Sequence, residues 1–495
     1  MYGQERLNPH YVLRYGWTKE FFEHFSPLQY RNIELPLTLV RNFHVFIRPI
    51  VNTHLSDDNF VRHMKKKHQM LTVRNAQQVL QRMPNVVRDL SKVPGRNTIV
   101  MPAIMIQFAL EQFPETPVII TISNKRDKIA LENKNLPPHF TVFDIYKERK
   151  KFELSETEIT KLKRVANRLL RKKKQHIVFG QPRFKKWLYK HLIEAQMMVK
   201  CLHHLIINRP VGVTVDHVEI VNPGTTLSLL AATYNLPFIN VPQVLISDRS
   251  LIPTRASHYL IWGENYEKWL LKRGIPSSKI SIVGNLKFEY AAKAKTRSRE
   301  PVRHLLRIPD EHLVVTFTTQ PFSFAEQVNK NLIQWIGTAS QSLPLTVIIR
   351  AHPYDPFDYC SLLSNQTNIK ISPPKIDLHD LFKETDFMLT ISSNTAIEAA
   401  LYKKGILVLQ PELPYDYEHH NNDFNAHLAR ARAGPVIRNS LQLRQEFDAL
   451  LKNPQHRKQV VEQGQLFLKN TIAQKGPPSV LVRRFIQLLL HEKQI

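Results

Sequence analysis

The sequence is poor in the residues that mark disulfide-bonded, zinc-binding and glycine-loop proteins. Its two cysteines, Cys201 and Cys360, lie far apart and have no CxxC partner, so neither a disulfide framework nor a zinc site is predicted. Such sparse use of cysteine is typical of a reducing cytoplasm. Glycine occurs only 14 times in 495 residues, so we do not expect glycine-rich loops to be the main means of binding phosphate.

Long apolar runs are also missing. The longest, residues 227–246, is interrupted by tyrosine, asparagine and proline, and it predicts a helix, a turn and a strand, not a membrane span. The first ten residues hold no apolar core of the kind found in signal peptides. We therefore expect a cytoplasmic protein.

Acidic residues are outnumbered by basic ones, 42 against 69, which gives a formal net charge of +27. A surface of this charge attracts polyanions such as nucleic acid, anionic lipid or an acidic glycan. Residues 161–174 form a basic stretch with apolar residues at helical spacing. This pattern fits either a solvated helix packed by its apolar side or a helix lying on an anionic membrane. No RRM, zinc-finger or helix-turn-helix signature accompanies the charge, so nucleic acid is not an expected partner.

What the sequence does contain is a regular alternation of short apolar strands and helices from about residue 310 onward. The length predicts two or three domains, and an apolar content of 43% allows each a buried core. The alternation predicts a parallel sheet covered on both faces. The expected strands are 312–319, 345–350, 368–372, 387–391 and 405–410, and the expected helices are 323–340, 356–363, 377–383 (with Asp377 as N-cap) and 394–402.

The N-terminal half shows the same alternation more weakly. Its expected strands are 43–48, 97–101, 117–122, 211–215, 238–241 and 259–262, with a long helix over 184–205. The basic stretch 291–301 has no β pattern and suits a linker. We therefore predict an α/β protein of two Rossmann-like parallel-sheet lobes that face each other across a cleft. The expected parts are an irregular aromatic cap (1–40), an acceptor-side domain (41–290), a nucleotide-donor domain (305–475) and a C-terminal helix that packs back on the first lobe (476–495).

The first candidate binding cluster follows the expected strand 345–350. In an open parallel sheet, ligands bind beyond the carboxyl ends of the strands. Arg350 offers a planar fork of donors for a phosphate, and His352 can donate to a phosphate or protonate a leaving oxygen. Pro353 fixes the turn that presents both side chains. An ordinary turn at a strand end explains the same residues.

The second cluster follows the expected strand 387–391 and opens a helix. It consists of Ser392, Ser393, Asn394 and Thr395, and Glu398 lies in the first helical turn. Small polar residues at a helix start cap free amides, and the same amides bind phosphate. Glu398 can accept hydrogen bonds from ribose hydroxyls or close a capping box. A plain helix cap has the same appearance.

A third candidate, Gln320, follows the strand that opens this half of the chain. Because all three clusters follow strands of one predicted parallel sheet, their side chains should meet at one edge. Together they predict a nucleotide pocket, and no residue pattern in them calls for a metal.

Residues 259–285 carry a resemblance to a known superfamily. Their tryptophan-glycine, arginine-glycine and glycine-asparagine pairs resemble the passage that joins the two lobes of GT-B glycosyltransferase-like proteins. Residues 350–353 and 392–409 then follow in the order of that superfamily, and the resemblance covers roughly residues 200–415. The group includes capsule and lipopolysaccharide transferases, polysialyl- and Kdo-transferases, teichoic-acid glycerophosphotransferases and UDP-GlcNAc 2-epimerases.

The resemblance implies roles for particular residues. In sialyltransferases of this fold, a His-Pro motif and a serine pair hold the CMP part of the donor, and they match His352-Pro353 and Ser392-Ser393. A glutamate of the following helix contacts the ribose, which matches Glu398. The resemblance also implies that no metal and no cofactor is needed besides the nucleotide-activated donor.

Two departures leave the catalytic base open. The chain has Pro242-Gln243 where many relatives have His-Gly, and the acidic motif of sialyltransferases is missing. An inverting transferase needs a carboxylate or histidine to deprotonate the acceptor hydroxyl. Asp57 and Asp216, each expected to follow a strand, are the candidates, although Asp57 also fits a helix N-cap and Asp216 a loop acid. The His- and acid-rich residues 412–423 are expected to form a polar loop.

From these observations we predict a metal-independent glycosyltransferase that moves a sugar from a nucleotide-activated donor, with a CMP-sugar favoured. The acceptor is expected to be a surface polysaccharide or lipid-linked glycan, and the enzyme to be cytoplasmic, with peripheral contact to an anionic inner membrane face. A CDP-glycerol-type glycerophosphotransferase and a nucleotide-sugar epimerase are the alternatives. An epimerase or hydrolase would use several acids, such as Asp57, Asp216 and Glu219. A non-catalytic basic binding protein is the remaining hypothesis.

Overall fold

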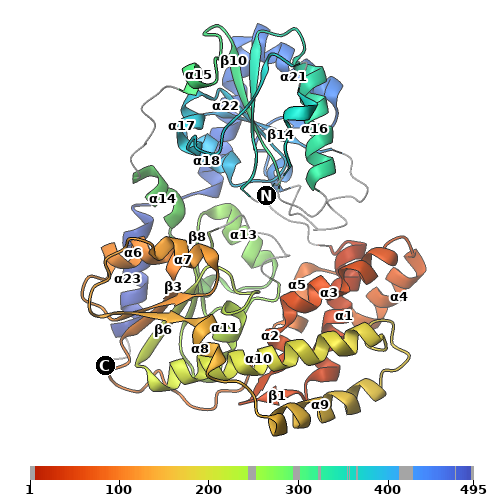
Figure 1. The fold of residues 1–495 in the computed structure, drawn as a ribbon, viewed down its shortest axis with the longest axis vertical. Coiled ribbons are helices and arrows are strands. Elements are labelled where there is room, and N and C mark those ends of the chain that lie inside the picture. Colours follow the sequence, from red (N-terminus) through yellow and green to blue (C-terminus); the bar gives the residue numbers. More distant parts are fainter. Residues whose placement is uncertain are drawn as a thin grey trace. The chain divides into compact units, whose positions relative to one another are not determined.

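A computed structural model describes residues 6–243, 252–293, 302–320, 325–353, 355, 357–363, 366–411, 427–473 and 475–491. These residues form two compact units (Figure 1). The N-terminal unit holds residues up to 262, residues 270–289 and those from 475 on, and the C-terminal unit holds 263–269 and 290–473. Each unit contains one parallel sheet flanked by helices.

The sheet of the C-terminal unit has six strands in the order β12-β11-β10-β13-β14-β15, and all of its pairings are parallel. The strands are β10 (Leu313–Thr318), β11 (Leu345–Arg350), β12 (Ile369–Ile371), β13 (Phe387–Thr390), β14 (Gly405–Leu409) and β15 (Val436–Ile437). The chain adds β11 and β12 on one side of β10 and then crosses to add β13 on the other. This reversal between β10 and β13 is a topological switch point, where a crevice opens at the carboxyl ends of the strands.

Helices cover both faces of this sheet (Figure 1), and alternating side chains of its strands pack against them. Val315 and Val347 belong to a core with α16 (Ala325–Ser340) and α21 (Ser440–Lys452). Val314 and Ile348, one residue away in each strand, belong to a second core with α17 (Leu378–Glu384). Because strand side chains alternate between faces, strands with apolar residues on both faces must be covered on both sides, as the sequence predicted. Asp377 caps α17 as expected, accepting a hydrogen bond from the backbone N–H of His379 at 2.8 Å.

The sheet of the N-terminal unit has seven parallel strands in the order β5-β4-β3-β6-β7-β8-β9. They are β3 (Thr98–Pro102), β4 (Val118–Ile122), β5 (Phe140–Asp144), β6 (Val211–Asp216), β7 (Phe238–Asn240), β8 (His258–Ile261) and β9 (Ile280–Ile282). Its switch point lies between β3 and β6. Strands β5 and β9 were not predicted from the sequence; they lie at the two edges of the sheet and are less buried than the central strands.

The expected strand 43–48 and the irregular cap 1–40 are both corrected by the structure. Residues 43–48 lie inside α3 (Val40–Thr53), whose buried Phe43, Ile47 and Ile50 recur at helical spacing. Residues 9–25 of the supposed cap form α1 (Pro9–Phe25), and Phe21 stacks on Phe43 with ring centroids 4.3 Å apart. The buried residues of α3 recur every three to four positions, which indicates a helix. A short apolar run such as 43–48 does not reveal this spacing.

The basic stretch belongs to α9 (Glu156–Arg171), which packs against α10 (Pro182–Asn208). Leu162, Leu169 and Leu170 are buried, whereas the lysines and arginines face solvent. The apolar side of α9 therefore contributes to the core of the unit and is not available for insertion into a lipid layer. None of the described helices is both long enough and apolar enough to cross a membrane.

Glu20 of α1 holds several basic groups together inside the N-terminal unit. Its carboxylate lies 2.6 Å from Nε2 of His176, 3.1 Å from Nε2 of His68 and 2.5 Å from Nζ of Lys67. Burial raises the pKa of Glu20, but these partners outweigh burial and hold the pKa well below its ordinary range. The carboxylate therefore ties α1 to α4 (Asp58–His68) and to the segment before α10.

The end of the chain returns to the N-terminal unit. Helix α23 (Pro478–His491) contacts β6 and α6 (Ile106–Gln112), and Phe485 meets the ring of His258 edge-on. One expected helix of the other unit is wrong, because among the described residues of 356–363 only Cys360–Leu362 form a 3-10 turn. Residues 294–301 of the expected linker and the His- and acid-rich residues 412–423 lie outside the described residues.

Candidate functional site

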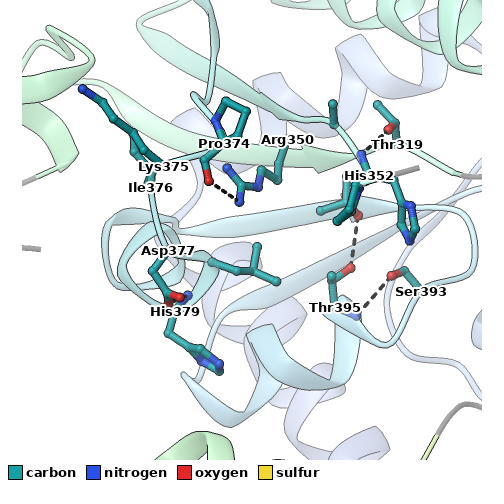
Figure 2. A pocket seen from close by; sticks show the side chains of 14 residues that line it. Thr319, Arg350, His352, Pro374, Lys375, Ile376, Asp377, His379, Ser393 and Thr395 are labelled. Atoms are coloured by element: carbon teal, nitrogen blue, oxygen red, sulfur yellow. Dashed lines mark hydrogen bonds between the residues drawn. The ribbon is translucent and has the colours of Figure 1, made fainter. Parts of the chain in front are cut away.

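A pocket of about 610 Å³ opens at the carboxyl edge of the six-stranded sheet, at its topological switch point (Figure 2). Its walls come from the ends of β10 and β11, the loop after β12 and the turn after β13. The lining residues are Thr318, Thr319, Arg350, Ala351, His352, Pro353, Pro374, Lys375, Ile376, Asp377, Leu378, His379, Ser393 and Thr395. Several residues that the strand-end rule singled out in the sequence line this pocket.

His352 is positioned by the neighbouring strand. The register pairs Thr318 with Arg350, and the backbone N–H of Thr319 donates to the carbonyl of Arg350 at 3.1 Å. One step further, the backbone N–H of His352 donates to Oγ1 of Thr319 at 2.8 Å. Because both turns are fixed to each other, the half-buried imidazole is held on the same side of the pocket as Ser393 and Thr395 (Figure 2).

Arg350 lines the pocket but also braces one of its walls. Its Nη1 donates to the carbonyl of Pro373 at 2.7 Å and to Oγ of Ser372 at 3.2 Å, and Nη2 donates to the carbonyl of Pro374 at 3.5 Å. Burial lowers the pKa of Arg350, while the charge of Asp377 raises it. An arginine remains charged under such a shift, so the guanidinium supplies a fixed positive charge and holds the loop after β12 in place.

The turn between β13 and α18 (Thr395–Leu401) contributes two hydroxyls. Oγ of Ser393 accepts a hydrogen bond from the backbone N–H of Thr395 at 3.2 Å. Oγ1 of Thr395 lies 3.1 Å from Oγ1 of Thr318, across the switch point. These contacts join the ends of β10 and β13 and place both hydroxyls in the pocket lining.

Other predicted site residues do not line the pocket. Gln320 is buried, and its side chain donates to the carbonyl of Thr318 and to Oγ1 of Thr390, both at 3.4 Å. Ser392 is buried with Oγ 3.4 Å from Nδ1 of His427. Glu398 is also buried, and neither it nor Asn394, at the N-cap position of α18, belongs to the lining. Of the predicted donor-binding residues, the pocket gathers Arg350, His352, Pro353, Ser393 and Thr395.

Three titratable residues of the lining were not among the predicted site residues. Lys375, Asp377 and His379 line the side of the pocket opposite His352 (Figure 2). They follow β12, so the same strand-end rule would have found them. Nδ1 of His379 lies 3.1 Å from the hydroxyl of Tyr402, which fixes the ring. The side chains of Lys375 and Arg350 are positively charged, whereas the one carboxylate of the lining, that of Asp377, already caps α17. The lining therefore favours binding of an anion.

The two candidate bases lie in the N-terminal unit and differ in position. Asp216 ends β6 and is buried, and its Oδ1 accepts from the backbone N–H groups of His217 at 2.6 Å and Val218 at 3.2 Å. Asp57 does not follow a strand. It is exposed and caps α4, accepting from the backbone N–H of Phe60 at 2.9 Å, so the premise for its catalytic role was wrong.

The epimerase hypothesis would place Glu219 at the sugar ring, but its carboxylate is bound to residues of the protein. It is buried, and burial raises its pKa against opposing hydrogen bonds from Thr254 and Arg255. Oε2 accepts from the hydroxyl of Thr254 at 2.5 Å, and the backbone N–H of Arg255 donates to Oε1. The carboxylate thus ties the loop after β6 to the residues before β8. Within the part of the chain that is described, no three histidine, cysteine or acidic residues are grouped to hold a metal ion.

Comparison with known proteins yields matches among solved structures. No protein-family model matches the sequence, and no curated protein matches it. A putative UDP-N-acetylglucosamine 2-epimerase from Listeria monocytogenes shares 14% identity over 81% of this chain and 97% of its own, with a TM-score of 0.52. UDP-GlcNAc 2-epimerase from Neisseria meningitidis, bound to UDP-GlcNAc, shares 15% identity over 79% and 99%, with a TM-score of 0.50.

The wall teichoic acid polymerase TagF matches over 90% of this chain and 98% of its own, at 11% identity and a TM-score of 0.44. The two epimerase structures show the fold. The chain has a GT-B-like α/β fold with two parallel-sheet units, which is the fold that the passage over residues 259–285 implied.

Proposed function

We propose that the pocket in the C-terminal unit binds the nucleotide part of an activated donor, and that the protein is a metal-independent transferase acting on it. The observation that carries this proposal is the pocket itself. It lies at the switch point of a parallel sheet, where nucleotides bind in this class of fold, and Arg350, Lys375 and His352 line it together with several hydroxyl-bearing residues. Fixed cations and N–H donors stabilise a departing phosphate without a metal.

The group transferred is a sugar in this proposal, with a CMP-activated donor favoured by the match of His352-Pro353 and Ser393 to the sialyltransferase motifs. The acceptor is a surface-polysaccharide or lipid-linked glycan hydroxyl. The net charge of +27 suits an acidic glycan or an anionic membrane face. Within the pocket, His352 donates a hydrogen bond or a proton to the leaving phosphate, and Arg350 and Lys375 balance its charge.

A second candidate is a nucleotide-sugar epimerase, because two proteins of the same fold carry that description and one of them was solved with UDP-GlcNAc. The sugar product of an epimerase is still attached to its nucleotide or is attached to it again. A transferase instead releases one nucleotide for each new glycosidic bond that it forms. A CDP-glycerol-type glycerophosphotransferase would bind CDP best. In that reaction the acceptor attacks a phosphorus atom and receives glycerol phosphate, instead of attacking the anomeric carbon of a sugar. Nucleotide preference and product analysis therefore separate the three.

The test is calorimetric titration of the full-length protein with CMP, CDP, UDP and GDP, without added metal and with EDTA. We expect one nucleotide to bind, with affinity lowered at least ~10-fold by His352→Ala and by Ser393→Ala. His304→Ala, at a histidine of the same unit outside this pocket, serves as the matched control. Absence of binding to all four nucleotides contradicts the proposal, and wild-type affinity of His352→Ala contradicts the role given to that residue.

A further inference from the structure

The carboxyl edge of the seven-stranded sheet carries a second group of polar residues at its own switch point. Asp216 is the last residue of β6, and His217 follows it in the chain. Strand β6 pairs with β3 on the side of β3 opposite to β4, so the order in which the chain adds strands reverses here. Asn240 ends the neighbouring strand β7, and Asp127 lies in the helix that follows β4. As whole residues, Asp216, Asn240 and Asp127 are at most 5% exposed. Asn240 and Asp127 nevertheless have buried polar side-chain atoms without a hydrogen-bond partner.

His217 and Asp216 form a close pair. Nδ1 of His217 lies 3.2 Å from Oδ1 of Asp216, which is ion-pair distance, although the nitrogen is not aimed well enough for a hydrogen bond. The His217 side chain is 21% exposed and that of Asp216 only 8%. The imidazole is therefore the member of the pair that a bound molecule can reach, and the carboxylate lies behind it.

The charges around the imidazole favour its protonated form. Burial lowers the pKa of His217, but Asp216 first and Asp127 second outweigh burial, and Arg126 opposes them, so that the pKa lies above its ordinary value. Asp127 is held by Ser123 and Asn124, which donate to its Oδ2 at 2.8 Å, while its buried Oδ1 has no hydrogen-bond partner. A carboxylate behind the ring stabilises the imidazolium that proton transfer creates.

Asn240 supplies an independent sign of a ligand. It is 1% exposed, and neither Oδ1 nor Nδ2 of its amide has a hydrogen-bond partner. The strand register pairs Asn240 with Asp216, so both side chains leave the same face of the sheet. A buried amide without partners is unfavourable, and a bound hydroxyl can satisfy it by accepting from Nδ2 and donating to Oδ1.

We propose that His217 is the group that takes the proton from the acceptor hydroxyl, that Asp216 positions it, and that Asn240 binds a hydroxyl of the same sugar- or polyol-like acceptor. This rests on the proposed function. The acceptor oxygen forms a bond to the donor's anomeric carbon, and the bond from that carbon to the phosphate oxygen breaks. The nucleotide leaves with the electron pair of that bond, and the hydroxyl proton passes to Nε2 of His217.

The first experiment replaces His217 by Gln and by Ala in the full-length enzyme. The donor is the one selected by nucleotide titration, and release of nucleotide is followed with water and with glycerol as acceptors. We expect kcat to fall by ~10²- to 10⁴-fold, with unchanged nucleotide affinity and partial rescue of His217→Ala by added imidazole. His63→Ala, at an exposed histidine of the same unit, is the control. Wild-type kcat in both His217 variants overturns the proposal.

The second experiment tests Asp216 as a positioning residue. Asp216→Asn keeps an oxygen that can accept from the backbone N–H groups but removes the charge. We expect the pKa of His217, followed by NMR of ¹³C-labelled histidine with the His217→Gln spectrum as assignment, to move down. The acid limb of the kcat profile should move to lower pH with it. An unmoved histidine pKa and an unmoved limb would show that the carboxylate has only a structural role.

The third experiment uses Asn240→Ala. Because the amide has no partner inside the protein, its removal should leave thermal stability equal to wild type or slightly higher, while KM for glycerol rises and nucleotide affinity stays the same. An unchanged KM overturns the role of Asn240. If wild-type protein binds none of the nucleotides, the proposed function fails. If it binds and turns over a donor but the His217 variants behave as wild type, this inference alone fails.

Discussion

Arg350 is the residue whose replacement best separates charge from architecture in the pocket. It lines the cavity, and it also donates to three acceptors of the loop after β12, at 2.7, 3.2 and 3.5 Å. Lysine keeps the positive charge but cannot make this fork of directed bonds. Methionine removes both. Comparing Arg350→Lys with Arg350→Met therefore measures the two contributions separately.

The magnitude follows from the contacts. The 2.7 Å bond from a charged donor to the carbonyl of Pro373 should contribute about 1.5–3 kcal/mol, and the two longer bonds less. Because Arg350 is only half-buried, we take about 2 kcal/mol for the loss in both variants. In a unit of this size, that corresponds to a fall in Tm of ~4–8 °C. For nucleotide affinity, lysine should lie within ~10-fold of wild type and methionine a further ~10-fold or more below it.

The assays are scanning calorimetry for stability and isothermal titration for nucleotide binding, with Arg438→Lys, in the same unit and outside the pocket, as the control. If Arg350→Lys has the Tm of wild type, the three bonds do not hold the loop and the structural part of the reasoning is refuted. If Arg350→Met binds nucleotide as tightly as wild type, the guanidinium is not part of the binding site.

Three further outcomes follow from the structure. Asp57→Ala should remove only a helix cap, with a loss of about 1 kcal/mol in chemical unfolding and unchanged turnover; a loss of turnover without loss of fold would restore its catalytic candidacy. Because the pKa of Glu20 is lowered in the folded protein, its contribution to stability is complete above the unfolded value, about 4.3, and disappears as pH falls toward the folded pKa. Glu20→Gln should therefore be less stable than wild type by ~1–3 kcal/mol at pH 7. Its free energy of unfolding, measured with urea, should also fall less steeply than that of wild type below about pH 4.5. If the stability-against-pH curves of the two proteins are parallel, this explanation is refuted. Gly434→Ala places a Cβ against the backbone carbonyl oxygen of Ile406, far inside van der Waals contact, and should lower stability by ~3 kcal/mol or more. The Cβ of Gly464→Ala meets only ordinary contacts, so this variant should be tolerated. Equal Tm values for the two variants would contradict the packing.

The sequence predicted the C-terminal unit well because most of its strands are short, largely apolar and separated by helices. The same regularity placed Arg350, His352, Ser393 and Thr395 together, since each follows a strand of one sheet. In the N-terminal half the pattern was ambiguous. An apolar run such as 43–48 fits a strand and a helix equally, and only the spacing of its buried residues over a longer window reveals α3.

Side-chain environment was beyond reach of the sequence. Gln320, Ser392 and Glu398 stand near pocket residues in the chain, yet they are buried and do not line the pocket. Whether a residue after a strand faces a cavity or the core depends on the direction of the turn, which contacts far along the chain decide. In the same way, Asp57 is a helix cap because its neighbours fold as α4 and not as the end of a strand.

The sequence by itself determined the two-sheet α/β architecture and the strand ends that carry the pocket, because apolar period and chain order fix which residues form a parallel sheet and where its carboxyl edge lies. Only the tertiary structure decided which side chains meet there. The pairing of Thr319 with His352, of Arg350 with the loop after β12, and of His217 with Asp216 depends on strand order and register, which bring together atoms that no local pattern relates.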